Sequence, residues 1–188
     1  MSAKVTKNNM DLIEASKHLH YEIWMLFKSM EFFLHYQNTF PRKPRSSLLW
    51  LPKNFEQIHS LNPAELQIHK NSFLQSFLVH FRNLTCFIYE IHIKPENDVV
   101  AVHYFSDPTE WRKRRPKKEK SFEQYLSNIG KTIVHLTYSR KEDHRRQWPL
   151  YNMAMTTRRP LIVFNDMVSE ERVIPNFKNE ISAILSRY

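Results

Sequence analysis

The stretch NPAELQIHKNSFLQSFLVHFRNLTCFIYEIHI, residues 62–93, decides the fold class, because both its start and its apolar spacing are helical. Asn62 can serve as the N-cap, Pro63 suits the first helical position, and Glu65 stands where a capping box places its acidic partner. One apolar stripe then runs until Pro95 ends the helix, and it consists of Leu66, Phe73, Phe77, Leu84, Ile88 and Ile91. The stretch therefore predicts a long amphipathic helix.

Two other stretches show the same spacing of apolar residues. Residues 9–37, which Asn8 or Asn9 can cap, form the first predicted helix, and Ser121 begins a third helix with Gln124 as its capping-box partner. The stripe of the first helix consists of Leu12, Leu19, Ile23, Leu26, Met30 and Phe33, and that of the third of Phe122, Leu126, Ile129, Ile133 and Leu136. Both stripes require burial against neighbouring helices.

Prolines mark the starts of the remaining helices. Pro149, Pro160 and Pro175 each suit the first turn of a helix, and Asp107 before Pro108 can start a short one. Each of these positions tolerates the missing backbone N–H of proline, because the first turn of a helix has no internal acceptor for it.

These patterns predict an all-α antiparallel helical bundle of four or more helices, joined by irregular connectors. We expect one helical domain over residues 1–188, with a disordered N-terminus at 1–8 and a basic loop at 112–120. The segment 99–105 could pair as a strand, although no partner strand is evident in the sequence.

Glycine is nearly absent, since Gly130 is the single glycine in 188 residues. Dinucleotide fingerprints, Walker loops and nucleophile elbows all require glycines, so these classes of enzyme are excluded. The lone Cys86 excludes internal disulfides and cysteine-based zinc sites, and we expect no metal and no cofactor. The N-terminus has no secretory pattern and no apolar run is long enough for a membrane helix, which predicts a cytoplasmic protein without membrane contact.

Positive charge is concentrated in one segment. Residues 112–146 hold twelve Lys or Arg against four Asp or Glu, which accounts for nearly all of the net charge of +9. This balance favours RNA, DNA or an acidic protein as partner, although a solvated loop that aids solubility is the simpler alternative. Aromatic residues nearby could stack on unpaired bases: Trp111, Tyr125, Tyr138 and Trp148. The candidate nucleic-acid contacts are Arg112, Lys113, Arg114, Arg115, Lys117, Lys118, Arg140, Arg145 and Arg146.

Two polar groups stand out on the predicted helices. His80 lies on or beside the apolar stripe of the second helix, with Arg82 and Asn83 next to it, and such a histidine is more often a satisfied core residue than a catalytic one. On the third helix a line of polar residues lies opposite the apolar stripe. In this polar line, His135 is a candidate acid or base and Lys131 a candidate phosphate contact; the alternative is that the line is an ordinary solvated helix face. Its members are Asn128, Lys131, His135 and Tyr138.

The pairing of SFLVHFRNLTCFIY, residues 76–89, with NIGKTIVHLTYSR, residues 128–140, resembles a group of small bacterial helical proteins. The segments LHYEIWML and NDVVAVHYF resemble that group as well, so the likeness spans about residues 19–150. The second segment is similar to the arginine-x(4–6)-histidine motif of the HEPN superfamily. The resemblance implies a helical bundle, often a homodimer, and in many members a metal-independent ribonuclease of a toxin or defence system.

Carried onto this sequence, the motif histidine falls on His135, the arginine on Asn128 and the polar residue on Gly130. The cation that would stabilise the transition state is therefore missing from its usual place, although Lys131 or Arg82 could supply it. Three functions follow: a HEPN-like bundle that binds nucleic acid with weak or no catalysis, a metal-independent endoribonuclease that uses His135, Lys131 and Arg82, or a non-enzymatic protein-interaction subunit.

Overall fold

Helices form the secondary structure of the described parts of the chain, which are residues 8–38, 62–91, 97–130 and 148–188 in this computed structural model. Within these ranges there are six α-helices and two short 3-10 helices, and no β-strand. The elements are α1 (Asn9–Asn38), α2 (Pro63–Tyr89), η2 (Ala101–Tyr104), α3 (Pro108–Arg114), α4 (Ser121–Ile129), α6 (Leu150–Met167), η4 (Glu170–Arg172) and α7 (Phe177–Leu185). The predicted all-α bundle is confirmed.

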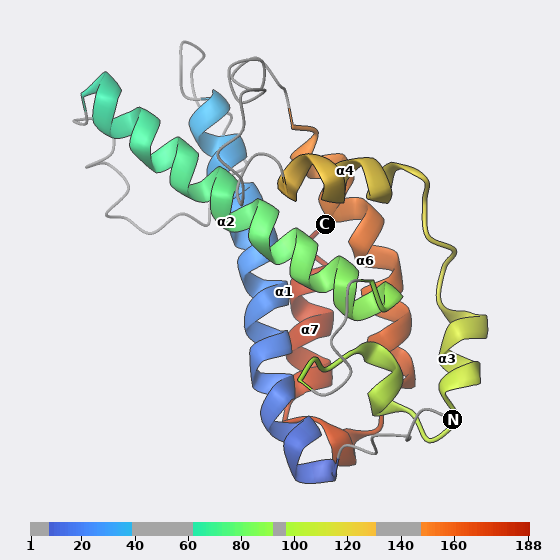
Figure 1. Cartoon of the computed structure of the whole chain (residues 1–188). Helices are drawn as coiled ribbons and strands as arrows, with labels where there is room; N and C mark the ends of the chain where they lie inside the picture. The colour runs from blue at the N-terminus through green and yellow to red at the C-terminus, as the bar shows by residue number, and fades with distance from the viewer. Residues whose placement is uncertain (1–7, 39–61, 92–96, 131–147) are drawn as a thin grey trace.

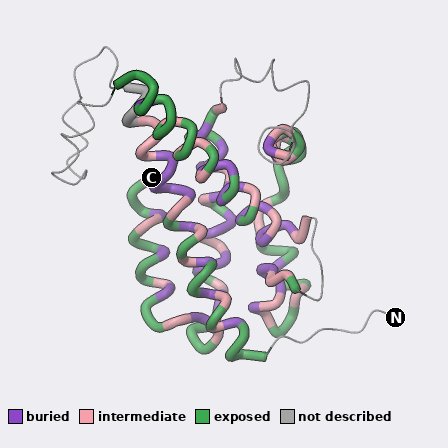
Figure 2. The backbone as a smooth tube through the Cα atoms, turned by 60° about the vertical axis from the view of Figure 1, so that its left-hand side comes forward, coloured by how far each residue is buried: buried purple, intermediate pink, exposed green. Residues whose placement is uncertain are grey.

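The helices α1, α2, α6 and α7 form the body of the bundle (Figure 1). The most extensive contact between two helices is that of α1 with α2. The helices α6 and α7 run in opposite directions, and both pack on α1. Buried positions lie on the sides that the helices turn toward one another (Figure 2). The short helices cover this body, with α4 against α2 and α3 against both η2 and α6.

Local hydrogen bonds explain where the two long helices begin. The Asn62 Oδ1 atom accepts from the backbone N–H groups of Ala64 and Glu65, both at 3.0 Å, and a Glu65 carboxylate oxygen accepts from the Asn62 N–H at 2.9 Å. The predicted capping box is therefore confirmed. Asn8 caps α1 in a simpler way, because its Oδ1 accepts from the Asp11 N–H at 2.8 Å.

Aromatic side chains join the helices into one core. Phe81 of α2 stacks on Phe122 of α4 with ring centroids 5.7 Å apart, and Phe164 of α6 meets Tyr104 of η2 edge to face at 5.4 Å. The buried Tyr104 hydroxyl donates to the backbone oxygen of Leu12 at 3.0 Å, which joins η2 to α1. Segments distant in sequence are thus held by both apolar contact and a satisfied polar group.

Three details of the predicted elements differ in the structure. The helix α2 ends at Tyr89 rather than near residue 93, because Glu90 adopts a left-handed conformation with φ of 58°. The helix α4 begins at Ser121 as predicted, but it has no capping box, because the Ser121 hydroxyl donates to Glu119 at 3.3 Å instead of capping the helix. Segment 99–105 contains the 3-10 helix η2 and not a strand, since its apolar side chains are buried against the helices.

The prolines of the C-terminal region also behave differently from expectation. Pro160 was expected to open or kink a further helix, and it lies inside the single helix α6. Its φ preference suits a helix, and burial of Met153, Leu161 and Phe164 on either side favours continuity despite the lost hydrogen bond. The last helix begins at Phe177, two residues after Pro175, because Asn176 adopts a left-handed conformation between them.

Gly130 ends the described part of α4 in a right-handed helical conformation, with φ of −55°. Among the described residues, no atom lies within 4 Å of the position that a Cβ would occupy there, so no close helix approach within this part of the chain requires a glycine.

We expect Gly130→Ala to raise the free energy of unfolding by about 0.5–1 kcal/mol, because alanine restricts the unfolded chain and favours helix. Urea denaturation at pH 7 measures the difference. A less stable alanine variant would instead indicate that another surface approaches Gly130 closely.

Candidate nucleic-acid interface

The helix α3 orients the basic segment. The Asp107 carboxylate accepts from the Thr109 N–H at 2.8 Å and so starts the helix at Pro108. Trp111 then anchors it: the indole is fully buried, and it stacks on Phe105 with centroids 5.4 Å apart and an interplanar angle of 10°. The expectation that Trp111 stacks on nucleic-acid bases is wrong, because its ring is packed inside the protein core and no face of it is open to a base.

Two arginines of the basic segment hold α3 against the end of α2. Arg112 binds the Glu90 carboxylate through Nε at 3.1 Å and through Nη2 at 2.5 Å. Arg115 donates to the same carboxylate at 3.2 Å and to the backbone oxygen of Ile88 at 2.7 Å, and its guanidinium lies 5.2 Å from the centre of the Tyr89 ring. Burial alone would raise the pKa of Glu90, but the two arginines outweigh it and hold that pKa below its usual range.

These contacts divide the predicted nucleic-acid residues into two groups. Arg112 and Arg115 are structural, and Lys118 pairs with Glu123 at 2.8 Å on the surface. In the described part of the chain no carboxylate pairs with Lys113, Arg114 or Lys117. Three of the nine residues of the predicted basic loop, 112–114, belong to α3 rather than to a loop.

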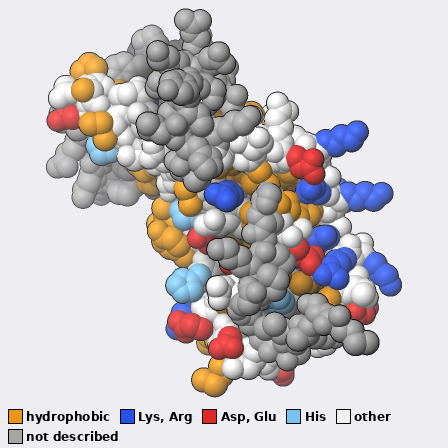
Figure 3. Space-filling model, in the orientation of Figure 1, with side chains coloured by type: hydrophobic (Ala, Val, Ile, Leu, Met, Phe, Trp, Pro, Cys, Tyr) orange, Lys and Arg blue, Asp and Glu red, His pale blue; other side chains and the backbone are white. Residues whose placement is uncertain are grey.

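We define the basic surface as the exposed side chains of Lys113, Arg114, Lys117 and Arg159. Arg159 comes from α6, yet it lines the same cavity as Lys117, which brings it to the connector between α3 and α4. Figure 3 shows Lys and Arg side chains gathered along the edge of the molecule where Figure 1 places α3 and this connector. A row of unpaired cations on one edge suits a polyanion.

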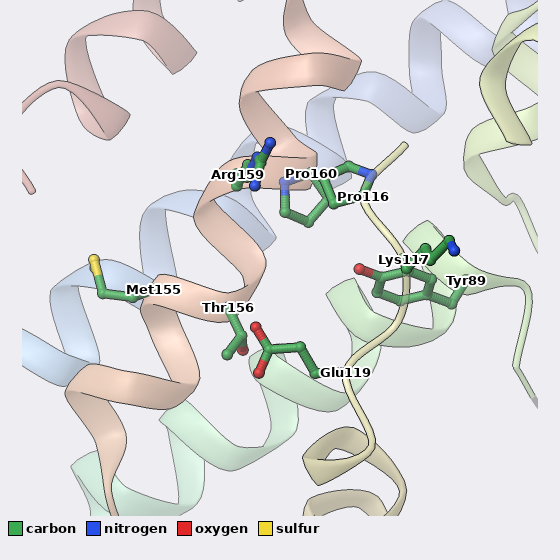
Figure 4. A pocket seen from close by; sticks show the side chains of 8 residues that line it. All are labelled: Tyr89, Pro116, Lys117, Glu119, Met155, Thr156, Arg159 and Pro160. Carbon is green, nitrogen blue, oxygen red and sulfur yellow. The ribbon is translucent and has the colours of Figure 1, made fainter. Parts of the chain in front are cut away.

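A cavity of about 410 Å³ opens between the connector, the end of α2 and the middle of α6. In Figure 4 the Glu119 and Thr156 side chains point toward each other, and the Tyr89 hydroxyl is directed into the same space. The guanidinium of Arg159 lies at one edge, and the Lys117 ammonium is directed away from the space at the other. The cavity therefore has one exposed carboxylate, that of Glu119, in its lining and basic side chains at its rim.

The Tyr89 hydroxyl remains protonated at neutral pH. Burial raises the pKa of Tyr89, the nearby charge of Arg115 opposes this rise, and the carboxylate of Glu119 adds to it. The hydroxyl is consequently available as a hydrogen-bond donor toward the cavity.

His80 is a structural residue between α1 and α2. Its Nδ1 atom lies 2.8 Å from a carboxylate oxygen of Glu22, and the Asn83 amide donates to both oxygens of that carboxylate at 3.2 Å. The imidazole is 8% exposed and meets Tyr21 edge to face, so it has little room for a substrate. This arrangement agrees with the interpretation of His80 as a satisfied core histidine.

Of the predicted catalytic residues, Arg82 is the one that lies within the described ranges. Arg82 lies one helical turn from Cys86 on α2; burial raises the pKa of that thiol, and the charge of Arg82 only partly counters the rise. Asn128 is half-buried near the end of α4, while Tyr125 meets Phe81 edge to face and Trp148 packs on the core. The remaining predicted residues lie outside the described ranges: Lys131, His135, Tyr138, Arg140, Arg145 and Arg146.

The sequence reasoning missed Glu90, Glu119 and Arg159. Glu90 gave no local signal, because both arginines that it binds lie more than 20 residues away. Arg159 gave no sequence signal either, because the packing of α6 beside the connector is what brings it to the cavity.

In the ranges that the structure describes, no three His, Cys, Asp or Glu side chains gather into a group that could hold a metal ion. Nor does any helix there combine the length and apolar character that crossing a bilayer requires. Comparisons of the chain with protein-family models, with curated proteins and with solved structures each found no match.

Proposed function

We propose that this chain is a HEPN-like helical-bundle protein that binds RNA or another nucleic acid through the basic surface, with weak catalysis or none. The observation that carries the proposal is that some cations of this region bind a carboxylate of the protein while others are exposed and have no such partner among the described residues. Arg112 and Arg115 hold α3 in place through Glu90, while Lys113, Arg114, Lys117 and Arg159 remain exposed along one edge. Fixed cations without internal partners release counterions from a phosphate backbone, which is the main source of affinity in such complexes.

We expect the double variant Lys113→Gln/Arg114→Gln to bind single-stranded RNA about tenfold more weakly at 0.1 M salt, because two phosphate contacts are lost. The slope of log K against log[salt] should fall in magnitude by roughly 1.4, which is two contacts at about 0.7 each. Fluorescence anisotropy with a labelled oligonucleotide, titrated from 50 to 300 mM salt, measures both quantities.

The matched control is Lys17→Gln/Lys70→Gln, which removes the same charge from α1 and the start of α2. Equal losses in the two double variants would mean that only net charge matters and would contradict a defined surface. Parallel titrations with DNA of the same sequence identify the preferred nucleic acid.

The same RNA samples also test the endoribonuclease alternative. Cleavage in EDTA that disappears in the His135→Ala variant would establish a metal-independent enzyme on this bundle. Absence of binding at low salt would contradict both nucleic-acid functions and leave the protein-interaction subunit, with an acidic protein as its partner.

A further inference from the structure

The cavity beside the basic surface has a specific pattern of hydrogen-bonding groups. Glu119 is exposed, and its carboxylate can only accept hydrogen bonds, whereas the protonated Tyr89 hydroxyl can donate one. The two groups line the same cavity, and Figure 4 shows the Tyr89 hydroxyl directed into the space that the Glu119 side chain borders. A ligand that fits this interior must therefore offer N–H donors next to an acceptor.

Pro160 interrupts the hydrogen bonding of α6 beside the same space. Because proline has no N–H, the backbone oxygen of Thr156 lacks its usual helical donor four residues on. Thr156 and Pro160 both line the cavity. The Thr156 hydroxyl itself donates to the Met153 oxygen at 2.6 Å and is thereby occupied.

The walls and rim suit the other parts of a nucleotide. Pro116, Pro160 and Met155 supply apolar surface for the faces of a planar ring, and the volume of about 410 Å³ falls within the roughly 300–1,000 Å³ of small-ligand sites. At the rim, the guanidinium of Arg159 can bind a phosphate in a bidentate manner, and Lys117 continues toward the rest of the basic surface.

We propose that this cavity is a subsite for one unpaired guanine nucleotide, with Glu119 accepting from N1–H and the N2 amino group and Tyr89 donating to O6. Guanine is the common base whose Watson–Crick edge carries two adjacent donors beside an acceptor. Adenine and cytosine would each place a ring-nitrogen acceptor against the carboxylate, and uracil offers a single donor between two carbonyls. Recognition of a splayed base on its Watson–Crick edge is the usual mode for single-stranded RNA. This inference rests on the proposed nucleic-acid binding and adds a base preference to it.

The test compares four labelled heptamers, UUUXUUU with X as G, A, C or U, by fluorescence anisotropy at fixed salt. We expect the G-containing heptamer to bind about tenfold more tightly than the others, which is within the range of one good bidentate contact to a base. In Glu119→Gln this preference should disappear, because the amide replaces one acceptor with a donor.

Glu123→Gln is the matched control, since Glu123 is an exposed carboxylate on α4 that pairs with Lys118 and does not line the cavity. Both variants remove one negative charge, so both should raise the affinity for the A-, C- and U-containing heptamers to a similar degree. The control must keep the preference for G; if it loses the preference as Glu119→Gln does, the effect is one of net charge and the subsite is contradicted.

The outcomes separate this inference from the proposed function. Salt-sensitive binding of all four heptamers with equal affinity would overturn the guanine subsite and leave nucleic-acid binding intact, whereas no binding of any heptamer would overturn both. Free 5′-GMP distinguishes the sources of the base. Glu119-dependent binding of GMP as tight as that of the G-containing heptamer identifies a mononucleotide ligand, and much weaker binding identifies the strand.

Discussion

Replacement of Trp111 by alanine should lower the free energy of unfolding by about 3–5 kcal/mol, the usual cost of removing a fully buried large aromatic side chain. Among the residues of α3, Trp111 is the buried one. Its ring stacks on Phe105 and meets Phe164 edge to face at 5.8 Å, so alanine would leave a cavity between α3 and α6. The helix that carries Lys113 and Arg114 would lose its main attachment.

Trp111→Phe is the informative companion variant. The indole Nε1 is buried, and no acceptor among the described residues lies within hydrogen-bond reach of it. Phenylalanine keeps a stacked ring and removes this unsatisfied donor, so its cost should be only about 1 kcal/mol. Urea denaturation followed by far-ultraviolet circular dichroism measures both variants. If Phe is as destabilising as Ala, the indole N–H makes a stabilising hydrogen bond, and the interpretation of Nε1 as an unsatisfied donor is wrong.

Glu90→Gln should lower the free energy of unfolding by about 1–3 kcal/mol at pH 7, because it weakens charge-assisted hydrogen bonds to Arg112 and Arg115. The carboxylate is 16% exposed, so water compensates for the loss only in part. Glutamine has nearly the same shape, which separates the charge from the packing. The exposed Glu123→Gln variant, whose lost partner is Lys118, should change stability little.

The stability difference between the native protein and Glu90→Gln should depend on pH. The folded pKa of Glu90 is lowered, so its ionised form contributes stability above the unfolded pKa of about 4.3, and this contribution is lost as the pH falls through the folded value. The difference between the native protein and Glu90→Gln should therefore be full at pH 7 and shrink progressively below about pH 4. A difference that stays constant down to pH 3 would contradict the role of the Glu90 charge.

Local chemistry made the long helices predictable. Asn62, Pro63 and Glu65 specify the start of α2 within four residues, and the structure has that capping box. The end of α2 was not predictable in the same way, because Glu90 is fixed by arginines 22 and 25 residues further along the chain. Sequence patterns report contacts within a few turns of a helix, whereas tertiary partners decide where this helix stops.

The candidate site also depends on tertiary contacts that the sequence pattern does not record. Trp111 stands next to four basic residues, and this neighbourhood suggested a base-stacking role. In the short helix α3, however, Trp111 faces the core while Lys113 and Arg114 face solvent. His80 was interpretable from its apolar neighbours, but its partner Glu22 lies 58 residues away. Arg159 joins Lys117 only because α6 packs beside the connector, which no spacing in the sequence records.

The buried indole of Trp111 also gives the protein an internal optical probe. A tryptophan surrounded by apolar rings emits at shorter wavelength than one in water, and Trp24 on α1 is exposed while Trp111 is not. Because Trp111 and the exposed cations Lys113 and Arg114 belong to the same short helix, a displacement of that helix would change the emission of this one residue. In a variant that retains Trp111 as its sole tryptophan, fluorescence would therefore report motion of the basic surface as a ligand binds.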